Sequence, residues 1–345
     1  MAQIDKPNLY FNTKLYTGNG STNAQTGVGF QPDWLWVKCR SDANGHQLFD
    51  ALRTTYSISS NETAAEANRA SDGFTSLDSD GFTMNGSGSG GNTNVNGRTY
   101  VAWNWKAGGA GSANTDGSIN STVSVNTTAG FSIVKYVGNA TSGATVGHGL
   151  SVAPKFIIIK SRDTNGLSWR SYHASLGAGK YIELDANAAA VTASNFMNDT
   201  APTSTVFSLG NGTTPNKSGD NYIVYCFAEK KGYSKFGSYT GNGNVDGTFV
   251  YTGFAPAFVM TKRTDSTSDW LICDNKRPGY NVINKKLFPN RSQGDDSYDS
   301  FDFVSNGFKI RSSGTGHNAS GGTFIYMAFA ENPIVGSNNT PTTAR

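Results

Sequence analysis

The sequence has few charged residues, no long hydrophobic run and only three cysteines among its 345 residues. Charged residues make up 15% of the chain, and the formal net charge is only +3, so the composition does not favour nucleic acid or an anionic membrane as a partner. No window approaches the ~20 apolar residues of a membrane span, and residues 1–7 lack the apolar core of a signal peptide. We therefore expect a protein that is made in a cytoplasm and is not inserted into a membrane.

Neither the cysteines nor the histidines are spaced like ligands or disulfide partners. The three cysteines occupy different positions within the internal repeats described below, which favours three reduced, buried thiols. The four histidines are isolated from one another and show no metal-ligand spacing. These residues are Cys39, Cys226 and Cys273, and His46, His148, His173 and His317. The sequence thus indicates no metal and no cofactor.

What the sequence does contain is one pattern repeated three times. A proline leads into an apolar run and a lysine follows six residues later, at residues 29–38, 149–160 and 253–262. Each repeat closes on an aromatic strand, beginning at Tyr100, Tyr222 and Phe324. The prolines are separated by 122 and then 102 residues, and so are the closing strands. Because two landmarks have the same spacings, we infer a triplicated domain.

The composition of each repeat predicts an all-β fold with little helix. The chain contains 41 glycines, and Asp-Gly and Asn-Gly at residues 80–81 and 306–307 are typical of β-hairpins. Repeats of about 100 residues with many short strands and turns are typical of β-sandwiches. Short helical turns are expected only at 63–69 and 185–190.

The predicted organisation is three tandem β-sandwich-like domains. The repeats cover residues 12–107, 130–232 and 233–335, with a Gly/Ser/Asn-rich linker and lead-in strand at 108–129 and a flexible tail at 336–345. The glycine-rich linker predicts that repeat one is freer, whereas the shorter joint near residue 232 predicts that repeats two and three are docked.

Candidate sites for chemistry are weak. Asp78–Gly81 and Asp163–Gly166 resemble the start of calcium loops, but neither has a carboxylate at the twelfth position, so both are interpreted as turns. The densest acidic cluster is interpreted as a solvated loop or an inter-subunit contact rather than as a catalytic carboxylate pair; it comprises Asp295, Asp296, Asp299 and Asp302. No residue is assigned a catalytic, cofactor-binding or metal-binding role, and we expect no enzyme.

Tryptophan pairs and a recurring lysine remain to be interpreted. Trp34 and Trp36 alternate onto one face of a strand, as do Trp103 and Trp105, and such a face could stack on sugar rings. Their counterparts in the other repeats are apolar side chains of varied shape, which favours a core instead. The recurring lysine is interpreted as a strand-end residue that protects a sheet edge; it is Lys38, Lys160 and Lys262.

Seven motifs carry a resemblance to a known family. They are residues 16–20, 30–38, 79–83, 100–109, 146–150, 172–177 and 237–243. Together they resemble an uncharacterised repeat domain family of virion proteins from marine tailed bacteriophages, cyanophages among them, which are often described as tail-fibre-like. The resemblance covers about residues 14–333 and implies no catalytic residues. In that family the repeats often follow a lectin-like domain, whereas here only residues 1–13 precede the first repeat, which favours a stand-alone appendage or direct docking onto the particle.

The leading expectation is a non-enzymatic structural protein of a tailed-phage virion, made in the bacterial host cytoplasm. A tail fibre or appendage component is favoured, assembled with copies of itself and with other virion proteins. The alternatives are a capsid-surface decoration protein and an adhesin that binds a host surface glycan. The adhesin hypothesis predicts an exposed aromatic side chain beside Asn or Asp residues in at least one repeat. A polysaccharide depolymerase is a further hypothesis and requires two facing carboxylates.

Overall fold

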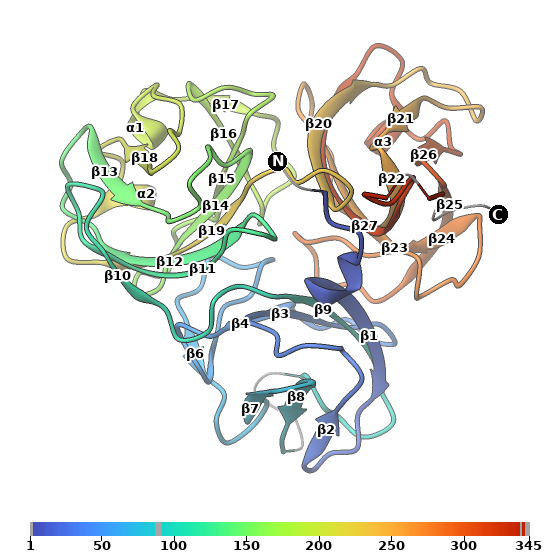
Figure 1. Ribbon diagram of the computed structural model, residues 1–345, viewed down its shortest axis with the longest axis horizontal. Helices are drawn as coiled ribbons and strands as arrows, with labels where there is room; N and C mark the ends of the chain where they lie inside the picture. Colours follow the sequence, from blue (N-terminus) through green and yellow to red (C-terminus); the bar gives the residue numbers. More distant parts are fainter. Residues whose placement is uncertain (1–2, 87–91, 339, 342–345) are drawn as a thin grey trace.

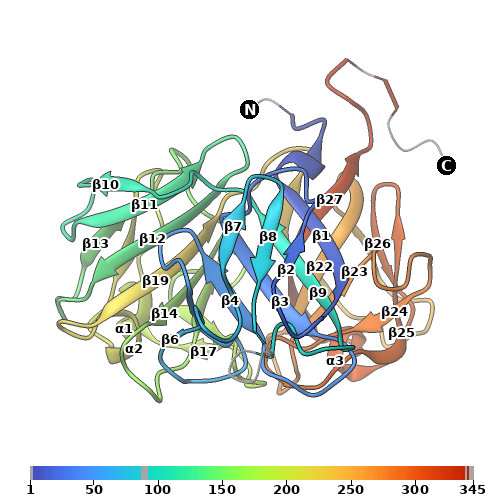
Figure 2. The same ribbon diagram turned by 90° about the horizontal axis from the view of Figure 1, so that it is seen from below.

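The computed structural model describes residues 3–86, 92–338 and 340–341, without the side chain of Asp299. Three lobes surround a common centre (Figure 1), and the two ends of the described chain lie at the same end of the molecule (Figure 2). Nearly all regular structure is β, and the helices of the described residues are the 3-10 turn η1 (Pro7–Leu9) and the four-residue α1 (Ser194–Met197), α2 (Thr213–Asn216) and α3 (Thr315–Asn318). The prediction of an all-β fold is confirmed.

Each lobe contains an antiparallel inner sheet whose four principal strands have the same order. In the first repeat these strands are β1 (Phe11–Thr17), β9 (Thr99–Trp105), β3 (Trp34–Cys39) and β4 (Gln47–Asp50). In the second they are β12 (Phe131–Val137), β19 (Asn221–Phe227), β14 (Phe156–Ser161) and β15 (Arg170–His173). In the third they are β20 (Ser234–Thr240), β27 (Thr323–Pro333), β22 (Phe254–Arg263) and β23 (Leu271–Asp274).

A second, outer sheet covers the far face of each inner sheet. The outer sheets are β2 (Asn23–Gln25), β8 (Gly81–Met84) and β7 (Ser76–Asp78); then β13 (Ala144–Gly147) and β18 (Val206–Leu209); and finally β21 (Phe249–Tyr251), β26 (Gly307–Ile310), β25 (Asp296–Val304) and β24 (Ile283–Lys286). The first repeat also carries a short ladder of β5 (Tyr56–Ser57) and β6 (Ala67–Asn68). Both expected hairpins are present, since Asp78 pairs with Gly81 and Val304 pairs with Gly307 across two-residue turns.

The central strands are buried at nearly every position and mostly apolar, because both faces of the inner sheet are covered. Trp34 and Trp36 of β3 face a core shared by all three lobes, whereas Leu35 and Val37 face the core of their own sandwich. This alternation recurs in β14 and β22. We call the shared cluster the central core; its members include Trp103, Trp105, Phe156, Ile158, Tyr225, Phe227, Phe258, Met260, Met327 and Phe329.

The central core corrects the expectation that the first repeat is freer than the others. The Trp34 ring lies 4.4 Å from the Tyr225 ring of the second repeat, and the Trp105 ring lies 5.7 Å from the Phe258 ring of the third. Burying large aromatic surface between lobes is strongly favourable. All three repeats are therefore docked against one another.

The segment 108–129 is also more ordered than its composition suggests. It contains β10 (Ser112–Asn114) and β11 (Ser121–Asn126), which extend the inner sheet of the second repeat beyond β12. That sheet is extended at its other edge by β16 (Lys180–Glu183) and β17 (Val191–Thr192). The glycine-rich sequence permits close approach here, because the Gly108 backbone lies against Val125 with no room for a Cβ atom.

Three local expectations need correction or qualification. Residues 63–69 and 185–190 form no helix, because both segments are extended against a neighbouring repeat: Glu66 N–H donates to Arg162 O and Ala190 N–H donates to Thr264 O, each at 2.9 Å. The described part of the expected flexible tail includes Ser337, which hydrogen-bonds to Asp5. Residues 339 and 342–345 of that tail lie outside the described residues.

Candidate functional site

The recurring lysine is buried in all three repeats, so the interpretation as an edge-protecting residue is wrong. Lys38, Lys160 and Lys262 are each 0% exposed. They lie on the same strand face as the central-core residues, near the strand end opposite the Trp34 position. Burial lowers the pKa of each ammonium group to about 8. A buried ammonium group needs hydrogen-bond acceptors.

Each buried lysine donates to a backbone carbonyl of a different repeat. Lys160 of the second repeat lies 3.1 Å from Thr63 O of the first. The equivalent contacts are Lys38 Nζ to Ser292 O at 3.1 Å and Lys262 Nζ to Asn187 O at 3.3 Å. The contacts therefore run from the second repeat to the first, from the first to the third, and from the third to the second. They close a ring with approximate threefold symmetry.

The acceptor segments are equivalent, and we call residues 59–66, 183–190 and 288–295 the clamp loops. Eight or nine residues after each lysine stands an aromatic residue whose ring N–H donates to the same clamp loop. Its acceptor is the backbone oxygen four residues before the one that accepts from the lysine. Trp169 Nε1 donates to Ser59 O at 2.8 Å, and Trp270 Nε1 donates to Glu183 O at 2.8 Å. His46 replaces tryptophan in the first repeat and lies 2.9 Å from Phe288 O. Because Trp36 Nε1 donates to His46 Nδ1, His46 Nε2 carries the proton and donates.

A third set of contacts is a backbone hydrogen bond that recurs at all three junctions. The donors are Glu66 N, Ala190 N and Asp295 N, and the acceptors are Arg162 O, Thr264 O and Arg40 O, at 2.9, 2.9 and 2.7 Å. The positions are equivalent, since each donor lies three residues after the acceptor of a buried lysine. Each junction thus has a lysine contact, a ring contact and a main-chain contact.

Two of the three junctions add a buried charge network. Between the second and first repeats, Arg162 pairs with Glu66 at 2.7 Å, and Glu66 also lies 3.8 Å from Arg53. Arg53 pairs with Asp50 at 2.6 Å with both side chains 0% exposed, and Tyr225 Oη donates to Asp50. The junction between the first and third repeats has the same arrangement. Asp295 pairs with Arg40 and Arg277, Arg277 also pairs with Asp274, and Trp103 Nε1 donates to Asp274.

The remaining junction, between the third and second repeats, has other residue types at every position of this charge network. The equivalent residues are Thr264, Ala190, Leu176 and His173. Met327 stands where Trp103 and Tyr225 stand in the other repeats and cannot donate a hydrogen bond. His173 Nε2 instead donates to the backbone oxygen of Tyr326, because its Nδ1 accepts from Ser175 N–H. The buried charges are thus present as complete sets or absent together, as burial demands.

The carboxylates that were considered as calcium ligands instead accept hydrogen bonds that stabilise turns. Asp78 accepts hydrogen bonds from Ser76 and Thr83, and Asp80 accepts from Gly27 N–H and Gly29 N–H. Those two backbone donors lower the pKa of Asp80. Asp163 accepts from the backbone and side chain of Asn221. Within the described residues, no three His, Cys, Asp or Glu side chains gather as a metal site.

The acidic cluster divides among several partners. Asp295 belongs to the charge network between repeats, which agrees with the interpretation as a contact but places that contact within one chain. Asp296 pairs with Lys286 and Asp302 pairs with Arg311. The side chain of Asp299 lies outside the described residues. The three cysteines are free and buried, as predicted.

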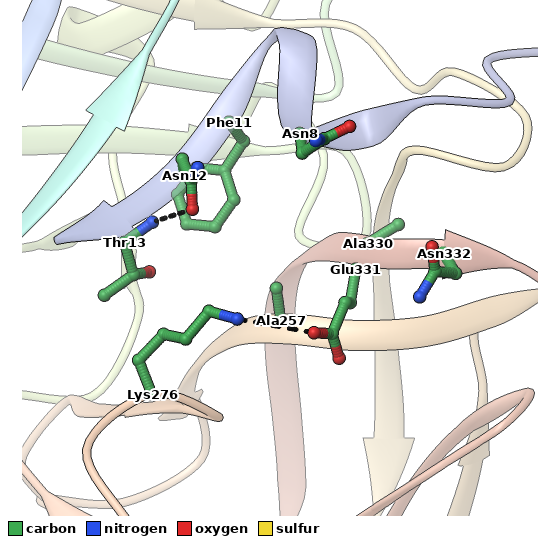
Figure 3. Close-up of a pocket in the computed structure, with 9 residues that line it drawn as sticks. All are labelled: Asn8, Phe11, Asn12, Thr13, Ala257, Lys276, Ala330, Glu331 and Asn332. Atoms are coloured by element: carbon green, nitrogen blue, oxygen red, sulfur yellow. Dashed lines mark hydrogen bonds and ion pairs between the residues drawn. The ribbon is translucent and has the colours of Figure 1, made fainter. Parts of the chain in front are cut away.

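Two adjoining hollows open on the third repeat. The smaller, of about 290 Å³, lies between the start of the first repeat and β27, with Asn8, Asn12 and Thr13 facing Lys276 and Glu331 (Figure 3). The larger, of about 810 Å³, shares Lys276, Glu331 and Asn332 with it and extends to Asn275, Tyr280, Phe303 and Pro256. A shallower hollow of about 510 Å³ lies beside clamp-loop residues Asn61–Ala64 and Asp185.

Sequence reasoning missed both the clamp loops and the hollows. The available signal for the clamp loops was the lysine that recurs at the end of each apolar run, since a residue kept at one position in all three repeats indicates a shared structural role. No signal in the sequence marked the hollows. In the described part of the chain, no helix has the length and apolar character needed to cross a membrane.

The comparisons with known proteins identify the chain by its family. The model of the family described as "Domain of unknown function (DUF7483)" matches residues 6–333. No curated protein matches the chain. The matched segment includes all three inner sheets, all three clamp loops and the central core apart from Ile4. The chain therefore belongs to the DUF7483 family.

Proposed function

We propose that this protein is a non-enzymatic structural component of a tailed-phage virion, with a tail fibre or other tail appendage as its favoured place. The observation that carries the proposal is the closed ring of buried contacts between repeats. At each junction a lysine, a ring N–H and a main-chain N–H donate hydrogen bonds to the neighbouring repeat. Separating the repeats would expose apolar surface and leave buried polar groups without partners. A body held in this way is suited to a particle component that persists outside the cell.

The third repeat is the favoured contact surface for other proteins. Five of the nine exposed large hydrophobic side chains among the described residues lie there: Val245, Phe249, Tyr251, Tyr280 and Tyr298. Phe249 and Tyr251 project outward from β21, while Val250 between them is buried. Because β21 is an edge strand of its sheet, a second chain could pair with it. A further copy of this chain or another virion protein is the partner we propose.

Immunogold labelling of intact virions tests the proposal directly. We expect antibody against the purified protein to label the tail or its appendages. Labelling of the head would replace the tail assignment by a capsid-surface decoration role, which is the alternative location. Purified particles that lack the protein altogether, by labelling and by mass spectrometry, would refute the structural role.

A further inference from the structure

Every residue that lines the larger hollow belongs to the third repeat. Lys276 and Glu331 form its centre, and the register of the inner sheets places Leu52 and Ala107 at the same positions in the first repeat. Leu52 and Ala107 are buried, and Gly111, directly before β10, lies against Leu52. In the second repeat the same positions are Ser175 and Glu229. The surface that is covered or altered in the other repeats is therefore open here.

The aromatic ring of Tyr280 lines this hollow and is exposed to solvent. Its side chain is 86% exposed. The equivalent residue of the first repeat is Tyr56, which is 38% exposed and does not line the hollow. Asn281 fixes the adjacent chain, since its Nδ2 donates to Phe303 O at 2.8 Å and its Oδ1 accepts from Phe303 N–H at 3.0 Å. The segment that carries Tyr280 is thus tied to β25.

The polar groups beside Tyr280 are balanced in charge. Lys276 Nζ lies 3.4 Å from Glu331 Oε1, and these side chains are 44% and 45% exposed. Asn275 Nδ2 donates to Glu331 Oε2 at 2.6 Å. The pair therefore offers an accessible donor and an accessible acceptor, with no net charge to select an ionic ligand. Such a surface matches a molecule with many hydroxyl groups and no charge.

We propose that the larger hollow binds a neutral oligosaccharide. One sugar ring stacks its apolar face on Tyr280, and the hydroxyl groups bond to Lys276, Glu331 and Asn332. The volume of about 810 Å³ is within the usual range for ligand sites. The exposed Tyr280 beside Asn275 and Asn332 is also the arrangement that the adhesin hypothesis predicts in at least one repeat. The site would give the proposed virion component a ligand on the host surface, so it rests on that proposal for its biological role.

Sugar binding by the purified full chain tests the site. The probes are soluble neutral hexasaccharides of α-1,4-glucose, β-1,4-glucose, α-1,6-mannose and β-1,4-N-acetylglucosamine, with hexagalacturonate as the acidic comparison. Saturation-transfer NMR and calorimetric titration should show saturable binding of at least one neutral probe. Tyr280→Ala should weaken that binding at least tenfold, and the matched control Tyr56→Ala should change it less than twofold. Raising sodium chloride from 50 to 300 mM should also change it less than twofold, because the site carries no net charge.

Several results would overturn the inference. They are the absence of saturable binding by every neutral probe, tighter binding of hexagalacturonate, and binding that Tyr280→Ala leaves unchanged. Self-association of the chain that Tyr280→Ala abolishes, without any sugar binding, would assign the hollow to a second copy instead. Each of these outcomes leaves the labelling of virions unaffected, so failure of the sugar site and failure of the structural role are distinguishable.

Discussion

Lys160 Nζ, buried in the second repeat, lies 3.1 Å from the carbonyl oxygen of Thr63 in the first. It also donates to Leu167 O at 2.8 Å within its own repeat. The lysine thus joins two segments that lie about 100 residues apart. Its equivalents, Lys38 and Lys262, do the same at the other two junctions, which makes this contact the clearest sign of the approximate threefold symmetry.

Replacing the buried lysine should weaken the folded chain. Lys160→Met retains the length of the side chain but leaves Thr63 O and Leu167 O without this donor, and we expect a loss of about 1–3 kcal/mol in the free energy of unfolding. Urea unfolding followed by circular dichroism measures the loss. The exposed Lys155 supplies the control, since Lys155→Met should change stability by less than about 0.5 kcal/mol. A Lys160→Met variant as stable as the natural chain would contradict this account.

Asp185 should make stability depend on pH. Burial raises the pKa of its carboxyl to about 6, whereas a free aspartate titrates near about 3.9. Between these values the folded chain holds a proton that the unfolded chain has lost. This contribution to the free energy of unfolding therefore falls as the pH rises from about 4 to 6, and the loss remains at higher pH.

Asp185→Asn removes this dependence, and the other repeats show that asparagine fits. Asn61 and Asn290 occupy the equivalent position and accept from the N–H groups of His46 and Trp270, as Asp185 accepts from Trp169 N–H. We expect the variant to be more stable than the natural chain by roughly 1–3 kcal/mol at pH 7.5 and nearly equal at pH 4. Thermal unfolding at both pH values measures the difference. A benefit that is the same at both would refute the titration as its cause.

The buried pair of Asp274 and Arg277 should behave as a unit. Arg277→Leu leaves the Asp274 carboxylate buried without its cation, and we expect a loss of about 3–5 kcal/mol. The double variant Asp274→His with Arg277→Leu reproduces His173 and Leu176 of the second repeat, and should lose less than half as much. Urea unfolding of the four chains of this cycle gives the coupling energy. Losses that simply add would show that the two residues act independently.

The central core predicts that the three repeats unfold together. Four of the six tryptophans lie in the first repeat, and Trp169 and Trp270 lie in the second and third, so fluorescence reports mainly on the first repeat and circular dichroism on all three. Because the repeats share the central core, the two signals should change in one coincident transition in urea. An earlier fluorescence transition would show that the first repeat unfolds by itself.

Trp34 should tolerate phenylalanine but not alanine. Phe156 and Phe258 occupy the equivalent position, and Trp34 contacts Phe131, Tyr225 and Phe227 of the second repeat. Trp34→Ala should cost about 3–5 kcal/mol because it opens a cavity, whereas Trp34→Phe should cost less than half as much. Calorimetry of both variants compares them. Equal losses would indicate that the indole itself, and not its volume, is required.

The sequence predicted the parts of this protein that depend on local chemistry. Proline before an apolar run, Asp-Gly and Asn-Gly pairs at expected hairpins, and matched spacings were enough to infer a triplicated all-β chain. Buried tryptophans followed from the apolar character of their counterparts. The lysine was misinterpreted because a strand-end lysine on a surface and one buried between lobes look the same in a sequence.

The candidate site depended on contacts between distant segments. The apolar character of β3, β14 and β22 on both faces follows from their sequences, since each must be covered on both sides. Only the tertiary structure decided that one of those covers is the other two repeats, because the cluster formed by the three equivalent faces has more buried apolar residues than the cluster inside any one sandwich. The same packing places each lysine against another repeat's carbonyl, and among the described residues it leaves Lys276, Glu331 and Tyr280 open to solvent.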